Sequence, residues 1–212
     1  MAAQRSDAAL RIAAMAGLAA GVGDLLMLGV ANGSSMFAGS RYVLLWLGGA
    51  IGVASIPAYY LGYASAARLL SPSLACHWLI AVGAALVALF GALTHGLTAL
   101  DIHVELAAGR GARPPAEAFA DPSSPLVICA LLAAAGAIVA TLGIVTAGMR
   151  SDRRDMMLAA LLNPTVLTIL MSIVATVSDP LRMYLQPSAP NLAHFAFFTL
   201  LARAAARGEP VH

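Results

Sequence analysis

Long apolar segments alternate with short polar ones along the entire chain. A helix needs roughly 20 apolar residues to cross about 30 Å of hydrocarbon. Segments of this kind, the last being the shortest, lie near residues 8–31, 41–69, 74–100, 124–149, 156–178 and 190–206. We therefore predict an all-α fold, a polytopic membrane bundle of about six transmembrane helices. It forms a single domain over residues 1–212, with a long outer loop at 101–123.

The composition agrees with a membrane protein. The chain is 60% hydrophobic and only 10% charged, whereas about a quarter of the residues of a soluble domain are charged. The first apolar segment lacks a convincing cleavage site and is long enough to span, so we expect a transmembrane helix rather than a removed signal peptide. The formal charge of +2 and the lack of a basic patch argue against nucleic acid as a partner.

The arginines predict the orientation, because cytoplasmic loops of membrane proteins are enriched in positive charge. With the N-terminus in the cytoplasm, eight arginines lie inside: Arg5, Arg11, Arg68, Arg150, Arg153, Arg154, Arg203 and Arg207. Four lie outside: Arg41, Arg110, Arg113 and Arg182. We therefore expect both termini to be cytoplasmic. Abundant Ala and Arg without any Lys is typical of GC-rich coding and indicates a bacterial cytoplasmic membrane.

The lack of lysine also excludes some chemistry. A lysine Schiff base with retinal or pyridoxal phosphate cannot form, and a Walker-A phosphate site has no lysine. Cys76 and Cys129 both lie in predicted helices without CxxC spacing. We expect them to be small buried apolar residues.

Asp24 stands out because it is an acid inside the first apolar segment. A carboxylate at the centre of a bilayer costs roughly 2.5 to 3.5 kcal/mol on insertion scales. Gly17, Gly21, Asp24 and Leu28 fall on one helical face, and the GxxxG pair allows another helix to approach closely. Asp24 is therefore expected to face protein. It either accepts hydrogen bonds from a neighbouring helix or Arg41, or donates and accepts protons in a low-dielectric pocket.

A second group of polar residues gathers toward the predicted outer side. It comprises His95, Asp101, His103, Asp179, Arg182, Asn191 and His194. This clustering predicts an outward-facing site. His95, His103 and His194 offer three zinc ligands, although their spacing matches no metal motif. Haem is disfavoured: an inner haem beside His77 lacks a second axial histidine, and only an outer pair of His95 and His194 is left. We favour no cofactor.

The fifth segment carries Thr165, Thr168, Ser172, Thr176 and Asp179 on one predicted face. This stripe indicates a cavity wall, with helix packing as the alternative, since Ser and Thr can bond their own helix carbonyls. Asn163-Pro164 should kink or break the helix. The Asn163 amide then either satisfies a freed carbonyl or lines the cavity floor.

Two further motifs suit an oily ligand with a polar head. Tyr59 in PAYYLGY shares a helical face with Arg41 and is expected to reach the cavity floor. In APNLAHFAFF, Asn191, His194 and Phe198 share one face, with a polar tip and an aromatic base. Ordinary packing at the membrane interface is the alternative for both motifs.

The motifs GVGDLLMLG, SRYVLLWLG, PAYYLGY and APNLAHFAFF, with the NP at Asn163-Pro164, resemble a bacterial six-helix integral membrane family. That resemblance implies the fold and brings no activity with it. By architecture alone the chain is also similar to membrane terpene cyclases and sterol isomerases, which imply acids such as Asp24 and Asp179. Ceramidase-like zinc hydrolases are a second analogy and imply His95, His103 and His194.

The expected function is acid–base isomerisation or cyclisation of a lipophilic, lipid- or isoprenoid-like substrate in an outward-opening pocket. The catalytic candidates are Asp24, His95, Asp179 and His194. The substrate-binding candidates are Arg41, Tyr59, Asn163, Thr168, Ser172, Arg182, Asn191 and Phe198. Alternatives are a zinc-dependent lipid hydrolase and a proton-coupled transporter or lipid- or haem-binding subunit. The GxxxG faces of the first two helices allow a homo-oligomer.

Overall fold

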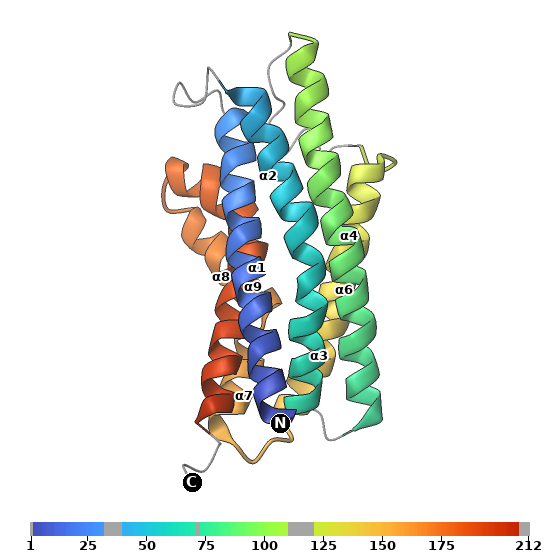
Figure 1. Cartoon of the computed structure of the whole chain (residues 1–212), viewed down its shortest axis with the longest axis vertical. Coiled ribbons are helices and arrows are strands. Elements are labelled where there is room, and N and C mark those ends of the chain that lie inside the picture. Colours follow the sequence, from blue (N-terminus) through green and yellow to red (C-terminus); the bar gives the residue numbers. More distant parts are fainter. Residues whose placement is uncertain (1, 32–39, 71–72, 110–120, 208–212) are drawn as a thin grey trace.

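The computed structural model describes residues 2–31, 40–70, 73–109 and 121–207, and these ranges contain helices and no strand (Figure 1). Part of the expected outer loop, with Arg110 and Arg113, and the terminal His212 lie outside these ranges. The elements in chain order are α1 (Ala2–Ala31), α2 (Arg41–Ser55), the 3-10 turn η2 (Ile56–Ala58), α3 (Tyr59–Leu70), α4 (Leu74–Ala107), α6 (Pro125–Gly148), α7 (Arg154–Leu161), α8 (Pro164–Ala175) and α9 (Asp179–Ala206).

Four helical segments among the described residues are long and apolar enough to cross a membrane: Ala8–Ala31, Arg41–Leu70, Leu74–Ala107 and Pro125–Gly148. The helices α7 and α8, bent by 56°, form a broken fifth candidate. Large apolar side chains cover the outside of these helices, among them Leu131, Leu142 and Trp78. The chain is an integral membrane protein.

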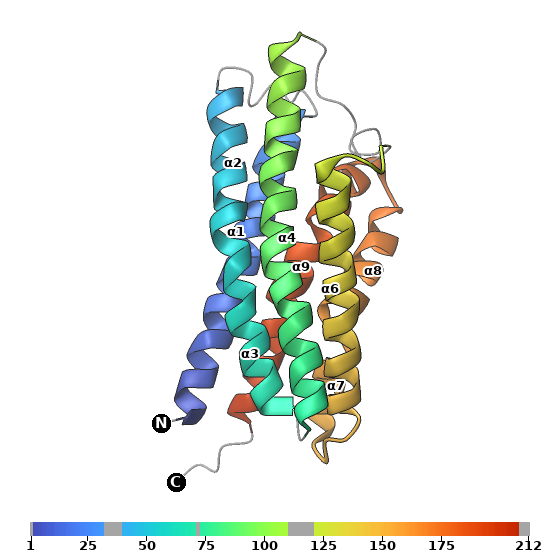
Figure 2. The same ribbon diagram turned by 90° about the vertical axis from the view of Figure 1, so that its right-hand side faces the viewer.

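The helices run along one long axis, and α1 begins at the same end of the bundle at which α9 finishes (Figures 1 and 2). The first and last helices pack against each other, α4 packs against α6, and α8 packs against α9. The turn between α8 and α9 lies below the upper ends of α2 and α4 in both views. The bundle is therefore shorter on the side of α8 than on the side of α4.

Four helix boundaries differ clearly from the sequence prediction. The first helix begins at Ala2 rather than near residue 8. The third helix continues to Ala107, because DIHVELA remains helical in spite of its charges. The fifth helix ends at Ala175, so Thr176 and Asp179 do not continue its face. The last helix begins at Asp179 and not near 190, with Pro187 and Pro190 inside it. Proline is disfavoured in a helix interior, so the pattern of residues does not by itself predict a helix that continues through Pro187 and Pro190.

The break between α7 and α8 was correctly predicted at Asn163-Pro164. Pro164 has no N–H for the carbonyl of Ala160, and Asn163 Nδ2 donates to that oxygen at 3.1 Å. Asn163 Oδ1 also caps α8 by accepting from the N–H groups of Thr165 and Val166, at 3.0 and 3.3 Å. The side chain is fully buried. Asn163 therefore satisfies the freed carbonyl and does not line the cavity.

Glycines let α1 approach two neighbours very closely. A Cβ on Gly17 would lie 2.6 Å from the backbone nitrogen of Phe195 and 2.9 Å from the carbonyl oxygen of Asn191. A Cβ on Gly48 would lie 2.6 Å from the carbonyl oxygen of Gly23. The small-residue faces expected to support a dimer are thus covered by α9 and by each other within one chain.

Candidate functional site

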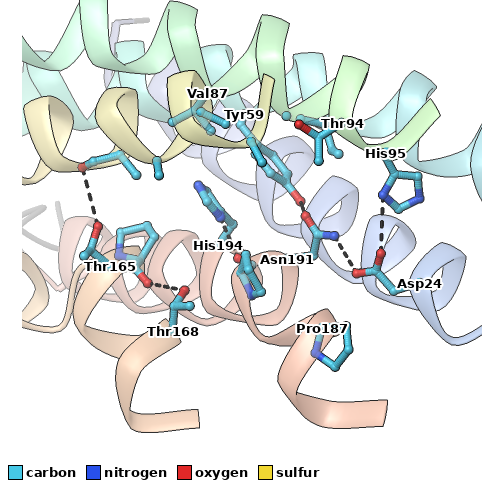
Figure 3. Close-up of a pocket in the computed structure, with 18 of the residues that line it drawn as sticks. Asp24, Tyr59, Val87, Thr94, His95, Thr165, Thr168, Pro187, Asn191 and His194 are labelled. Atoms are coloured by element: carbon cyan, nitrogen blue, oxygen red, sulfur yellow. Dashed lines mark hydrogen bonds and ion pairs between the residues drawn. The ribbon is translucent and has the colours of Figure 1, made fainter. Parts of the chain in front are cut away.

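A cavity of about 590 Å³ lies within the bundle, with walls from α1, α3, α4, α6, α8 and α9 (Figure 3). Its walls are mainly apolar. The polar side chains that line it are Asp24, Tyr59, Thr94, His95, Thr98, Thr165, Thr168, Gln186, Asn191 and His194. Ile138 on α6 and Ile169 on α8 also line it, yet 56% and 55% of their surface is exposed. The cavity therefore opens between these two helices on the outside of the helix bundle.

Asp24 is held from α9 and not by an arginine. Its Oδ2 accepts from Asn191 Nδ2 at 2.7 Å, and Asn191 Oδ1 accepts from the Tyr59 hydroxyl at 2.8 Å. All three side chains are buried. Figure 3 shows the chain of bonds running from Tyr59 through Asn191 to Asp24. Three helices that are distant in sequence thus fix the orientation of one carboxyl group.

His95 lies on the other side of Asp24, with its Nδ1 at 3.3 Å from Asp24 Oδ1. Its Nε2 lies 3.2 Å from the carbonyl oxygen of Gly48. The ring occupies a slot that only glycine leaves open, because a Cβ on Gly52 would overlap the imidazole. Since α2 presents no side chain at this point, the backbone oxygen of Gly48 can reach the ring.

These contacts limit the positions at which Asp24 and His95 can carry protons. A carbonyl oxygen only accepts, so Nε2 of His95 must donate to Gly48 and carries a hydrogen. The two atoms that face each other, Nδ1 of His95 and Oδ1 of Asp24, can then bond only through one further proton. That proton resides either on the carboxyl or on the imidazole. Asp24 and His95 thus face each other on the cavity wall across a position that one proton can occupy.

His194 is bonded at both ring nitrogens. Nδ1 donates to the carbonyl of Pro190 at 2.7 Å, so Nε2 accepts from the Tyr63 hydroxyl at 2.9 Å. The ring also stacks on Tyr59, with centroids 4.3 Å apart. His194 lines the cavity with the face of a neutral ring. Its geometry indicates that it holds Tyr59 in place rather than transferring a proton.

Several predicted site residues lie away from this cavity. Asp179 and Arg182 are exposed and bond each other, because the earlier start of α9 places them beside the turn after α8. Arg41 is exposed and lies over the ring of Tyr42, 5.1 Å from its centroid. His103 packs between the rings of Tyr42 and Trp46. The expected outer cluster is therefore divided among separate places.

The remaining predictions divide in the same way. Thr168 lines the cavity, but its hydroxyl donates to the carbonyl of Pro164. Ser172 lies outside the cavity lining. Phe198 is fully buried and packs against Tyr59, Tyr63 and His194 from behind. It supports the wall without forming part of it.

The histidines of the described part of the chain do not gather in one place. Among the described residues, no three His, Cys, Asp or Glu side chains gather as metal ligands. His95 and His103 are eight positions apart on one helix, a rise of about 12 Å. The ring nitrogens of His95 and His194 are bonded to the protein. Neither zinc at His95, His103 and His194 nor haem between His95 and His194 fits this arrangement.

Sequence reasoning missed four parts of the site. Tyr63, which the sequence did not single out as a site residue, bonds His194. Gly48 and Gly52, the GxxxG pair of the second helix, form the slot for His95. Gln186 lines the cavity, and its place directly before Pro187 was a usable signal.

Comparison of the chain with family models, curated proteins and solved structures finds no match. The resemblance and the analogies drawn from the sequence therefore stay predictions.

Proposed function

We propose that the chain is an integral membrane enzyme that isomerises or cyclises a lipophilic, lipid- or isoprenoid-like substrate by acid–base catalysis. One observation carries the proposal: Nδ1 of His95 lies 3.3 Å from Oδ1 of Asp24 on the wall of an apolar cavity, where one proton can pass between the two side chains. Burying an acid in such a cavity costs free energy unless partners compensate it, so an acid kept there is typical of a functional site. Asn191 and His95 compensate Asp24 while leaving one proton transferable.

The same pair supplies both halves of a proton shift. In one direction, the acidic proton of the pair adds to one carbon of a substrate double bond and leaves a carbocation. The resulting base then removes a proton from a neighbouring carbon, or from the carbon of a new ring, and a double bond forms. The pair regains the proton that it lost, so no cofactor and no water are consumed. Asn191 and Tyr59 keep the carboxyl oriented during this cycle.

We further propose six membrane crossings with both termini in the cytoplasm of a bacterium. The chain passes along the bundle six times if α2 with α3, and α7 with α8, are each counted as one crossing. The arginine distribution favours the end at which α1 begins as the cytoplasmic end. In this orientation the substrate enters Asp24's cavity in the outer half of the membrane.

A lipid-binding or carrier subunit is the second candidate. The opening between α6 and α8 suits a carrier as well as it suits an enzyme. The two candidates differ in one respect: an enzyme changes covalent bonds to hydrogen, and a carrier does not. The zinc hydrolase has less support, because its three histidines do not converge.

The test is hydrogen exchange into carbon. The purified protein is incubated in D₂O with the neutral-lipid extract of a bacterial membrane, and the lipids are analysed by mass spectrometry. The enzyme introduces deuterium into C–H positions of one lipid class, and Asp24→Asn abolishes this incorporation. Asp152→Asn changes an exposed loop carboxylate and serves as the matched control. Incorporation that persists in Asp24→Asn refutes the mechanism, and lipid binding without incorporation favours the carrier.

A further inference from the structure

The cavity lining contains no cation. Among the described residues, its ionisable members are Asp24, Tyr59, His95 and His194, and no arginine belongs to it. Arg41 and Arg182, the sequence candidates for binding an anionic head, are exposed elsewhere. A buried anion needs a positive partner, since desolvation costs several kcal/mol per ion. A phosphate or carboxylate beside Asp24 would also meet a group that can carry the same charge.

A cationic head has no place either. Both oxygens of Asp24 are already engaged, Oδ2 by Asn191 and Oδ1 by His95. An ammonium would have to displace one of these partners, and it would compete with the proton that the pair shares. The lining therefore favours an uncharged molecule.

Gln186 offers the polar contact that such a molecule needs. It lines the cavity on an exposed part of α9, and no hydrogen bond of its side chain is present among the described residues. Its backbone carbonyl also lacks the usual helical donor, because Pro190 has no N–H. At Pro164 the equivalent carbonyl, that of Ala160, is bonded by Asn163. Around Gln186 a donor and acceptors are thus left for a ligand, and a hydroxyl can use both.

The wall beside the opening suits an extended hydrocarbon chain. On α6 the lining residues are small or aliphatic: Ala130, Ala133, Ala134, Ala137 and Ile138. On α8 the hydroxyl of Thr168 is turned back to its own helix, so this side presents carbon as well. A chain lying in the bilayer can slide between Ile138 and Ile169 without leaving an apolar environment.

We propose that the cavity binds an uncharged lipophile with a hydroxyl or carbonyl oxygen, which enters from the bilayer between α6 and α8 and is hydrogen-bonded by Gln186. This inference rests on the proposed function and specifies its substrate class. It excludes phospholipids, polyisoprenyl phosphates and long-chain amines as the molecules bound in the cavity.

Photolabelling in phosphatidylcholine nanodiscs tests the inference. Four diazirine probes share one polyisoprenyl chain and carry an alcohol, a monophosphate, an amine or no head. The alcohol is expected to label the peptides of Ile138 and Ile169, and the two charged probes at least about tenfold less, because burying a charge costs more than one power of ten in affinity. Equal or stronger labelling by the phosphate or the amine overturns the substrate class.

Two variants test the site itself. Gln186→Leu should reduce labelling by the alcohol about three- to tenfold, the effect of one hydrogen bond, and leave the headless probe unchanged. Ala134→Phe should block all probes, whereas Ala135→Phe, exposed and outside the lining, should not. Alcohol labelling that is unaffected by Gln186→Leu overturns the role of Gln186, and unimpeded labelling of Ala134→Phe overturns the route of entry.

These experiments do not depend on turnover. Alcohol-selective labelling without deuterium incorporation supports the binding site and refutes the enzyme. Deuterium incorporation with labelling that ignores the headgroup supports the enzyme and refutes the substrate class.

Discussion

Asn191 Nδ2 donates to Asp24 Oδ2 at 2.7 Å, across 167 positions of sequence. The same amide accepts from Tyr59, so one side chain connects α1, α3 and α9. Buried polar groups that lose a partner retain their full desolvation cost. The bond therefore serves the stability of the bundle as well as the orientation of the carboxyl group.

Asn191→Ala should lower the free energy of unfolding by about 1–3 kcal/mol, because it leaves Asp24 and the Tyr59 hydroxyl without this partner. Titration of the purified protein with sodium dodecyl sulfate, followed by circular dichroism, measures the change. Ser188→Ala on the same helix is the control. Its hydroxyl only returns to the carbonyl of Tyr184, so a loss below about 0.5 kcal/mol is expected. Equal losses in the two variants would contradict the bridging role of Asn191.

Gly17→Ala should be destabilising by about 1–3 kcal/mol, the usual cost of overpacking. The added methyl meets backbone atoms of Asn191 and Phe195, which cannot move separately. Gly21→Ala is the matched change one turn later, where the methyl meets the end of the Leu192 side chain at 3.0 Å. In thermal unfolding in detergent, the melting temperature of Gly21→Ala should be clearly higher than that of Gly17→Ala. The reverse order would refute the close α1–α9 contact.

Gly52→Ala should expel the His95 ring from its slot and break its bond to the Gly48 carbonyl. In the unchanged protein, ¹⁵N spectra of labelled histidine should identify His95 as protonated at Nε2. The variant should lose the slow hydrogen exchange of that Nε2–H. Gly96→Ala lies on the same helix as His95, but its methyl meets only Val53 at 3.2 Å, and the His95 signal should persist. A His95 signal unchanged in Gly52→Ala would mean that the ring does not occupy this slot.

Asn163→Ala should destabilise the broken helix by at least about 1–2 kcal/mol, the range for a lost N-cap. The change removes two capping bonds and the donor to the Ala160 carbonyl. Thr168→Val keeps the shape of a side chain whose hydroxyl bonds its own helix, so it should be nearly neutral. Hydrogen exchange of the α8 amides locates the effect. Protection that is unchanged in Asn163→Ala would show that Pro164 alone sets the break.

The sequence was sufficient to predict which face of α1 is buried. Gly17, Gly21, Asp24 and Leu28 are all buried, since helical periodicity relates positions on a single rigid element. The sequence also predicted the break at Pro164, because missing N–H groups are a local property. These successes concern one helix at a time.

The prediction of one outer polar cluster was wrong because it concerned several helices at once. Depth in the membrane can be read from position along a helix, but the direction around the bundle depends on which helix packs against which. His103 shares a helix and a side of the membrane with His95, yet it contacts Tyr42 and Trp46. Asp179 was assigned to the fifth helix, and the longer α9 moved it out of reach. The bond of Tyr63 to His194 and the place of Gln186 in the cavity lining depend on how α9 packs in the bundle, which the sequence of one helix does not show.

The contact between α1 and α9 also bears on biogenesis. Ribosomal synthesis delivers α1 to the membrane before α9, so Asp24 is inserted before Asn191 has been made. Until then the carboxyl must be satisfied by water or by His95 after α4 follows, and the groove at Gly17 stays open. The helices that have already entered the lipid are therefore fully stabilised only when α9 packs against α1. Mutations in α9 should therefore appear in cells as a failure of α1 to assemble into the bundle.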